Sequence, residues 1–179
     1  MKKLFTVILL MMFYIGSVAL TSFAMDYRSW QNPTKIKTYI PSNSKRTISM
    51  RHACAEWSRL TQNRIVFVYV TNPNVANLIV KFVPVIPEAA DREIGLTKAR
   101  FTPDGKMVKA EVLIADKAPD GRVLGKDAVY TVMLHELGHA IGIGKHSENP
   151  LSIMFPAEDD RQEILKSVIK TLADIYGWK

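Results

Sequence analysis

The sequence predicts an α+β fold with about five short strands, two long helices and a C-terminal helix. Short runs rich in Val, Ile, Phe and Tyr alternate with turn-forming Pro, Gly and Asn, as strands do. One segment repeats apolar residues at helical spacing, and a later segment is apolar almost all round, as a helix buried in a core is. The chain has 179 residues, which is enough for one domain with a sizeable core.

The first residues are typical of a secretory signal peptide. Two lysines precede an apolar run over residues 4–20, which ends in Ser22-Phe23-Ala24. This pattern predicts a signal peptide over residues 1–24, cleaved after Ala24, and one domain over 25–179. The alternative is an uncleaved anchor, because the run is near the ~17 residues at which a helix begins to span a bilayer. We expect a secreted protein, extracellular or periplasmic, that does not stay in the membrane after cleavage.

Charge and cysteine content narrow the function classes. The formal net charge is +7, but basic residues are scattered and do not interleave with aromatic ones, so we expect no nucleic-acid partner. Cys54 is the only cysteine, which excludes an internal disulfide. It lies on the apolar stripe of a predicted helix, which favours a buried inert thiol over a nucleophile or an intermolecular bridge. We expect a monomer.

The elements of the first half follow from alternation and helical spacing. Residues 35–40 alternate polar and apolar side chains and predict a short half-buried strand. Thr47 is predicted to cap a helix that runs to Thr61. Its apolar face holds Met50, Ala53, Cys54, Trp57 and Leu60. Two strands are then predicted at 64–70 and 78–83, separated by an Asn-Pro-Asn turn signal.

The second half contains two more strands and two helices. The strands, at 95–101 and 108–115, are joined by Pro103-Asp104-Gly105, a strong turn signal. The helix that begins near Lys126 or Asp127 is the one that is apolar almost all round. The last helix is predicted from about Arg161 to Tyr176, ending at Gly177.

The buried helix contains His135-Glu136-Leu137-Gly138-His139. Residues four apart lie on one helix face, so the imidazoles of His135 and His139 can converge on one ion near the ~2.0 Å zinc–nitrogen distance. Glu136 lies beside that face, placed to contact a water on the metal. The alternative is a pair of core histidines satisfied by backbone carbonyls.

A third histidine follows closely. Gly142 would let the helix stop with a residue at positive φ, and the chain then reaches His146 within four residues. Three histidines and a water would complete a tetrahedral catalytic site with one position open for substrate. Neutral imidazole favours one Zn²⁺ ion over magnesium or calcium, while iron and manganese remain alternatives on spacing alone.

These residues resemble the metzincin clan of zinc peptidases, whose signature is His-Glu-x-x-His-x-x-Gly-x-x-His followed by a turn that contains methionine. Here the turn is Ser152-Ile153-Met154-Phe155-Pro156. The sequence is similar to matrixins in particular, because the helix around residues 55–59, the strands at 95–96 and 110–115, and the closing Tyr176-Gly177 fall in matrixin-like order. The resemblance implies a twisted mixed sheet with two long helices packed on it, an active-site cleft and a small C-terminal subdomain that ends in a helix.

One extra residue separates this chain from the family pattern. Three residues, 143–145, stand between Gly142 and His146 where the family has two, so Lys145 occupies the usual ligand position. A protonated ammonium has no lone pair for a metal. We expect His146 to be the third ligand and Gly144 to absorb the extra residue as a bulge.

Other third ligands remain open. The step from His146 to Met154 resembles the family's spacing, which supports the histidine. In other zinc-peptidase clans the third ligand is a more distant carboxylate, and here Glu158 or Glu163 could take that role.

The resemblance implies a secreted zinc-dependent endopeptidase that hydrolyses peptide bonds by a metal-activated water. Glu136 would take the proton of this water as general base and hand it to the leaving amine. Met154 would form the apolar floor of the site. The expected partners are a peptide or protein substrate and, as a candidate regulator, a protein inhibitor.

The family also implies where substrate lies. The peptide would run antiparallel to the edge strand at 95–101, in contact with Gly95 and Leu96. Phe155 and Pro156 would line the specificity pocket.

Two other functions remain open: a noncatalytic zinc-binding module of the same fold, motivated by Lys145, and an amidase acting on cell-wall peptides. His52 is expected on a polar helix face, which leaves no histidine for a second zinc. Structural Ca²⁺ is not indicated by any spacing. Loop carboxylates of suitable chemistry are Asp91, Asp104, Asp116 and Asp120.

Overall fold

The computed structural model describes residues 28–86, 93–157, 159 and 161–179. The predicted signal peptide therefore lies outside the described residues. One five-stranded mixed sheet forms the base of the domain, in the order β2-β1-β3-β5-β4. Its strands are β1 (Ile36–Tyr39), β2 (Phe67–Tyr69), β3 (Leu78–Val83), β4 (Gly95–Phe101) and β5 (Met107–Ala115). The strands β2, β1, β3 and β5 are parallel, and β4 is the antiparallel edge strand.

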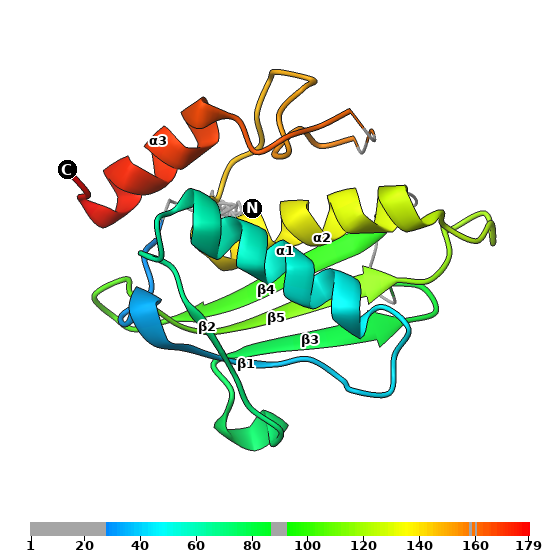
Figure 1. The fold of residues 1–179 in the computed structure, drawn as a ribbon, viewed down its shortest axis with the longest axis horizontal. Helices are drawn as coiled ribbons and strands as arrows, with labels where there is room; N and C mark the ends of the chain where they lie inside the picture. Colours follow the sequence, from blue (N-terminus) through cyan, green and yellow to red (C-terminus); the bar gives the residue numbers. More distant parts are fainter. Residues whose placement is uncertain (1–27, 87–92, 158, 160) are drawn as a thin grey trace, which may run out of the picture.

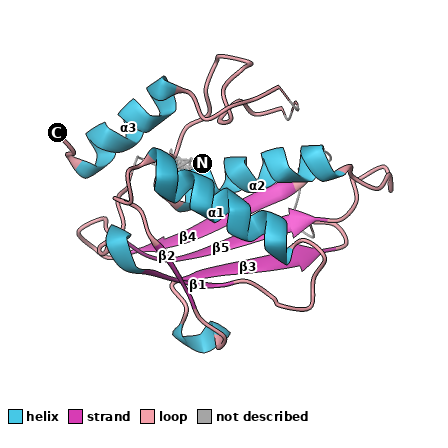
Figure 2. Cartoon of the chain, viewed as in Figure 1, coloured by secondary structure: helices cyan, strands magenta, loops and turns pink. Residues whose placement is uncertain are grey.

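Three α-helices accompany this sheet: α1 (Thr47–Leu60), α2 (Lys126–Ala140) and α3 (Lys166–Tyr176). Figure 1 shows α1 and α2 on one side of the sheet, with α3 beyond them. Short 3-10 helices lie at Pro33–Lys35 and Pro73–Val75, and a long loop connects α2 to α3 (Figure 2). The predicted α+β class, the mixed sheet and the two long helices packed on it are confirmed.

The core lies between α1, α2 and the sheet. Trp57 on α1 is fully buried, and its Nε1–H donates to the Leu134 carbonyl of α2 at 3.0 Å. At the C-terminal end of α2, Trp30 Nε1–H donates to the Ala140 carbonyl at 2.8 Å and holds the segment before β1 against the helix. The Tyr176 hydroxyl of α3 donates to the Ile141 carbonyl at 2.7 Å. The end of α2 is thus fixed from two sides.

Two local predictions at helix starts are wrong. Thr47 is the first residue of α1 and not its cap; its hydroxyl contacts the carbonyl oxygens of Pro41 and Ser44 and holds the preceding loop. The last helix begins at Lys166 instead of Arg161. The residues before Lys166 pair instead with the turn around Met154 (the Met turn): Ile153 N–H donates to the Glu163 carbonyl, and Glu163 N–H donates to the Leu151 carbonyl.

The strand predicted at 64–70 is shorter than expected, because only Phe67–Tyr69 pairs with β1. The turn after it does not make a hairpin. β2 and β3 lie on opposite sides of β1, both parallel to it. The two strands joined by the predicted turn at Pro103-Asp104-Gly105, β4 and β5, pair with each other as an antiparallel hairpin.

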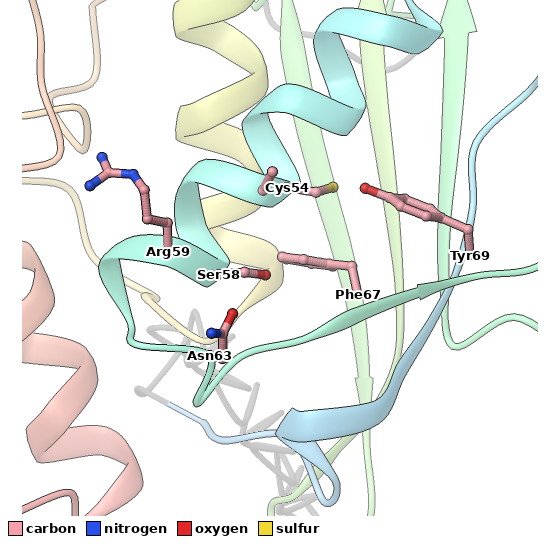
Figure 3. A pocket seen from close by; sticks show the side chains of 7 residues that line it. Cys54, Ser58, Arg59, Asn63, Phe67 and Tyr69 are labelled. Carbon is pink, nitrogen blue, oxygen red and sulfur yellow. The ribbon is translucent and has the colours of Figure 1, made fainter.

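Cys54 is fully buried on α1, as predicted. Its sulfur points from the helix towards the hydroxyl of Tyr69 on β2 (Figure 3). Burial raises the pKa of the thiol to about 12, and this outweighs the lowering by a hydrogen bond with Tyr69 and by the charge of Arg51. A thiol with this pKa is inert at neutral pH.

Candidate metal centre

Three histidines converge at the C-terminal end of α2. The two on the helix, His135 and His139, lie one turn apart with their Nε2 atoms 3.1 Å from each other. His146 arrives from the following loop and places its Nε2 3.3 Å from that of His139. One ligand nitrogen from each ring lies within 4.8 Å of the other two. A tetrahedral zinc with bonds of about 2.0–2.1 Å requires ligand atoms about 3.3 Å apart, so this spacing fits the ion.

Backbone carbonyls fix the orientation of two rings. His135 Nδ1 lies 2.8 Å from the Ile153 carbonyl oxygen, and His139 Nδ1 lies 2.6 Å from that of Ile143. A carbonyl oxygen only accepts, so each Nδ1 carries the hydrogen and donates. The neutral tautomer that results has its lone pair on Nε2, the atom that faces the other histidines.

The three rings are neutral at pH 7. Burial, with a smaller effect of neighbouring histidines, lowers the pKa of His135 to about 4 and that of His139 to about 3. Burial also lowers the pKa of His146. Neutral imidazole is the form that ligates a metal, so the donor set fits zinc in charge as well as in spacing.

A glycine turn brings His146 into place. Gly142 has φ +117°, a conformation that side chains rarely adopt, and its N–H donates to the His139 carbonyl at 3.0 Å. Further along the loop, Ser147 N–H donates to the Met154 carbonyl at 2.7 Å. The side chain of His146 meets the two helix histidines.

Met154 packs against α2 at Gly138, the residue before His139. It is 2 % exposed, and its Sδ occupies the space where a side chain of Gly138 would lie. Gly138 stands between His135 and His139 on α2. The same turn supplies the Ile153 carbonyl that holds His135.

Glu136 is 6 % exposed and is held by the edge strand β4. The Thr97 hydroxyl lies 2.6 Å from Glu136 Oε2 and 3.0 Å from the Glu136 carbonyl oxygen. Gly95 lies against the same side chain: a Cβ there would come within 2.6 Å of Glu136 Oε1. The sequence did not point to Thr97, because its contact depends on how β4 lies against α2.

The histidines and Glu136 open onto a cavity of about 760 Å³. Its walls come from β4, α2, the segment 118–124 and the loops around residues 144–146 and 156–157. Of the four residues predicted to contact substrate, Gly95, Leu96 and Pro156 line this cavity, and Phe155 does not.

A comparison with known protein families agrees with this geometry. The sequence profile of the matrixins matches residues 26–177, most of the chain. The chain belongs to the matrixin family. It is therefore a metalloendopeptidase domain with a histidine triad able to bind zinc. No curated protein matches the chain.

Of the other carboxylates considered for metals in this matrixin, those that the structure describes do not join the three histidines in a metal-ligating group. Glu163 lines a different cavity, with Glu56, and Glu158 and Asp91 lie outside the described residues. Asp116 pairs with Arg46 at 3.0 Å and Asp120 with Arg122 at 3.6 Å. Asp104 lies in the exposed β4–β5 turn. Within the described part of the chain, the histidine triad is the one group of metal-ligating side chains close enough to hold an ion.

No helix in the described part of the matrixin is long and apolar enough to cross a membrane.

Proposed function

We propose that this matrixin is a secreted zinc endopeptidase in which Glu136 is the general base. The observation that supports the proposal is a juxtaposition: three neutral imidazoles with converging Nε2 atoms and a buried carboxylate line one cavity. A pair of core histidines satisfied by carbonyls would leave the third histidine and the cavity without a role.

Each residue of the site has a task in the proposed reaction. His135, His139 and His146 hold the zinc through Nε2. When bound, zinc supplies a Lewis acid that acidifies a water molecule and polarises the scissile carbonyl. Glu136 accepts a proton from the attacking water while the water oxygen bonds to the carbonyl carbon. As the carbon–nitrogen bond breaks, Glu136 donates that proton to the amine nitrogen and returns to its carboxylate form.

The edge strand β4 is proposed to hold the substrate. Among the described residues, β4 pairs with β5 alone, so its other edge can accept an extended peptide as an added antiparallel strand. Gly95 and Leu96 lie at the cavity end of this strand. We keep Pro156 and Phe155 as candidate specificity residues, Pro156 from its place in the cavity wall and Phe155 from its place beside it in the sequence.

The test compares zinc-loaded wild type with Glu136→Gln on an unfolded protein substrate. We expect wild type to cleave it, a chelator to stop the cleavage, and the variant to lose activity while keeping one zinc per chain. Glu163→Gln is the matched control, because that carboxylate lies in a different cavity; its activity should equal that of wild type. Full activity of zinc-loaded Glu136→Gln would refute the mechanism. Hydrolysis of cell-wall peptides alone would assign the site to an amidase.

Export is tested separately. Expression of the full chain in cells with a secretion pathway should yield an exported protein whose first residue is Met25. Retention of residues 1–24 in a membrane fraction would contradict the secreted assignment and favour the anchor.

A further inference from the structure

We propose that Thr97 is a positioning residue, which holds the Glu136 carboxylate in the orientation that proton transfer requires. The inference rests on the proposed function, because it takes Glu136 as the general base. It adds that β4 fixes this base, in addition to holding the substrate.

The first observation is the hydrogen bond itself. The Thr97 Oγ1 to Glu136 Oε2 distance of 2.6 Å is in the range of a hydroxyl that donates to an ionised carboxylate, about 2.5–2.7 Å. The hydroxyl has one hydrogen, and the charged oxygen is a stronger acceptor than the Glu136 carbonyl oxygen at 3.0 Å. Glu136 is nearly completely buried, where a carboxylate needs such a partner.

The second observation is the space beside the bond. Side chains two apart on a strand point to the same face, so Gly95 and Thr97 both face Glu136. A Cβ at Gly95 would come within 2.7 Å of Glu136 Cγ and of Val132 Cγ1. The Glu136 side chain therefore fills the space over Gly95, with Oε1 against that glycine, and the Thr97 hydroxyl binds Oε2. β4 constrains both oxygens of one carboxylate.

The rigidity of Thr97 suits this task. A β-branched side chain has few χ1 rotamers, and β4 is anchored along its length, with Thr97 opposite Val112 of β5. A glutamate has several rotatable bonds and would otherwise sample orientations in which neither oxygen reaches the water. Misplacement of a catalytic group by about 1 Å can cost about 100-fold in rate.

The experiment measures kcat and KM separately for zinc-loaded Thr97→Val and Thr97→Ser on a quenched fluorescent peptide that wild type cleaves. Valine keeps the shape and removes the hydroxyl, and serine keeps the hydroxyl. We expect Thr97→Val to lower kcat by about 10- to 100-fold with KM changed less than about threefold, and with one zinc per chain. Thr97→Ser should recover most of the lost kcat.

A threonine elsewhere on the same hairpin provides the control. The Thr102 hydroxyl bonds to Lys106 in the β4–β5 turn, so Thr102→Val should keep the kcat of wild type. If Thr97→Val does not fold, Thr97→Ala is measured in the same way against Thr97→Ser.

The outcomes separate this inference from the proposed function. A wild-type kcat in Thr97→Val, a change in KM alone, or a Thr97→Ser variant as slow as Thr97→Val would overturn the positioning role. In those cases the proposed function still stands if a chelator stops cleavage by wild type and Glu136→Gln is inactive. An active Glu136→Gln overturns both.

Discussion

Replacing Gly142 by alanine should destabilise the protein more than a substitution at any ordinary turn glycine. The backbone at Gly142 has φ +117°, and an added Cβ would come within 2.5 Å of the Arg28 carbonyl oxygen and 3.3 Å of its carbon. These are backbone atoms, and they are held in place because Arg28 N–H donates to the Gly142 carbonyl at 3.3 Å. Neither side can yield without breaking that contact.

The magnitude has two parts. A residue forced into a sparsely populated φ region costs about 1–3 kcal/mol. Steric overlap in a packed region costs about 1–3 kcal/mol more. We therefore expect Gly142→Ala to lower the free energy of unfolding by about 2–6 kcal/mol, which is a large share of the stability of a typical domain. Because Gly142 sets the path from His139 to His146, zinc affinity should also fall.

Gly177 provides the matched control. It has φ +66° at the end of α3, and nothing lies within 4 Å of an added Cβ, so Gly177→Ala should cost only the left-handed backbone term of about 1–2 kcal/mol. The free energy of unfolding of both variants, freed of metal with a chelator, is measured by urea unfolding monitored by tryptophan fluorescence. If Gly142→Ala is no more destabilising than Gly177→Ala, the close approach of Arg28 to the end of α2 is refuted.

Three further predictions concern pH, thiol reactivity and a buried arginine. The metal-free protein should lose stability as the pH falls below about 6.5, because His135 binds a proton with an ordinary pKa in the unfolded chain, whereas burial keeps its pKa near 4 in the folded protein. The free energy of unfolding should fall by about 2 kcal/mol from this residue by pH 5. Urea midpoints that do not fall between pH 7 and pH 5 would contradict this prediction. Cys54 should resist thiol reagents at pH 8 until denaturant is added, as mass spectrometry of the labelled protein would show; rapid labelling of the native protein would mean that the thiol is not buried. Arg46→Met removes a hydrogen bond of 2.6 Å to the Ala115 carbonyl and should lower the free energy of unfolding in urea by about 1–3 kcal/mol. Arg59→Met, at an exposed position, should change that free energy by less than about 0.5 kcal/mol. Equal losses in the two variants would contradict the role of burial.

The sequence predicts the elements of this fold well where the signal is local. The β4–β5 hairpin follows from a Pro-Asp-Gly turn between two strand-like runs, and α2 follows from its apolar composition. The sheet order does not follow, because the placement of β2 and β3 on either side of β1 depends on contacts far apart in the sequence. The predicted start of α3 is wrong for the same reason, because Glu163, which was expected to be helical, pairs with the Met turn instead.

The candidate site divides in the same way. Helical spacing alone is enough to bring His135 and His139 together. The prediction for His146 depends on the resemblance to the family and on placing the extra residue between Gly142 and His146. The structure places the His146 ring beside those of the two helix histidines. The contact of Thr97 with Glu136 could not be predicted from the sequence, since it depends on how α2 packs on the edge strand.

The coordination of the metal tests the central claim most directly. Crystals of the zinc-loaded protein, with anomalous scattering recorded at the zinc absorption edge, would locate the ion and its ligands. We expect one ion bonded to Nε2 of His135, His139 and His146 at about 2.0–2.1 Å. An ion bonded to the two helix histidines, with Lys145 or solvent in the place of His146, would contradict the three-histidine site.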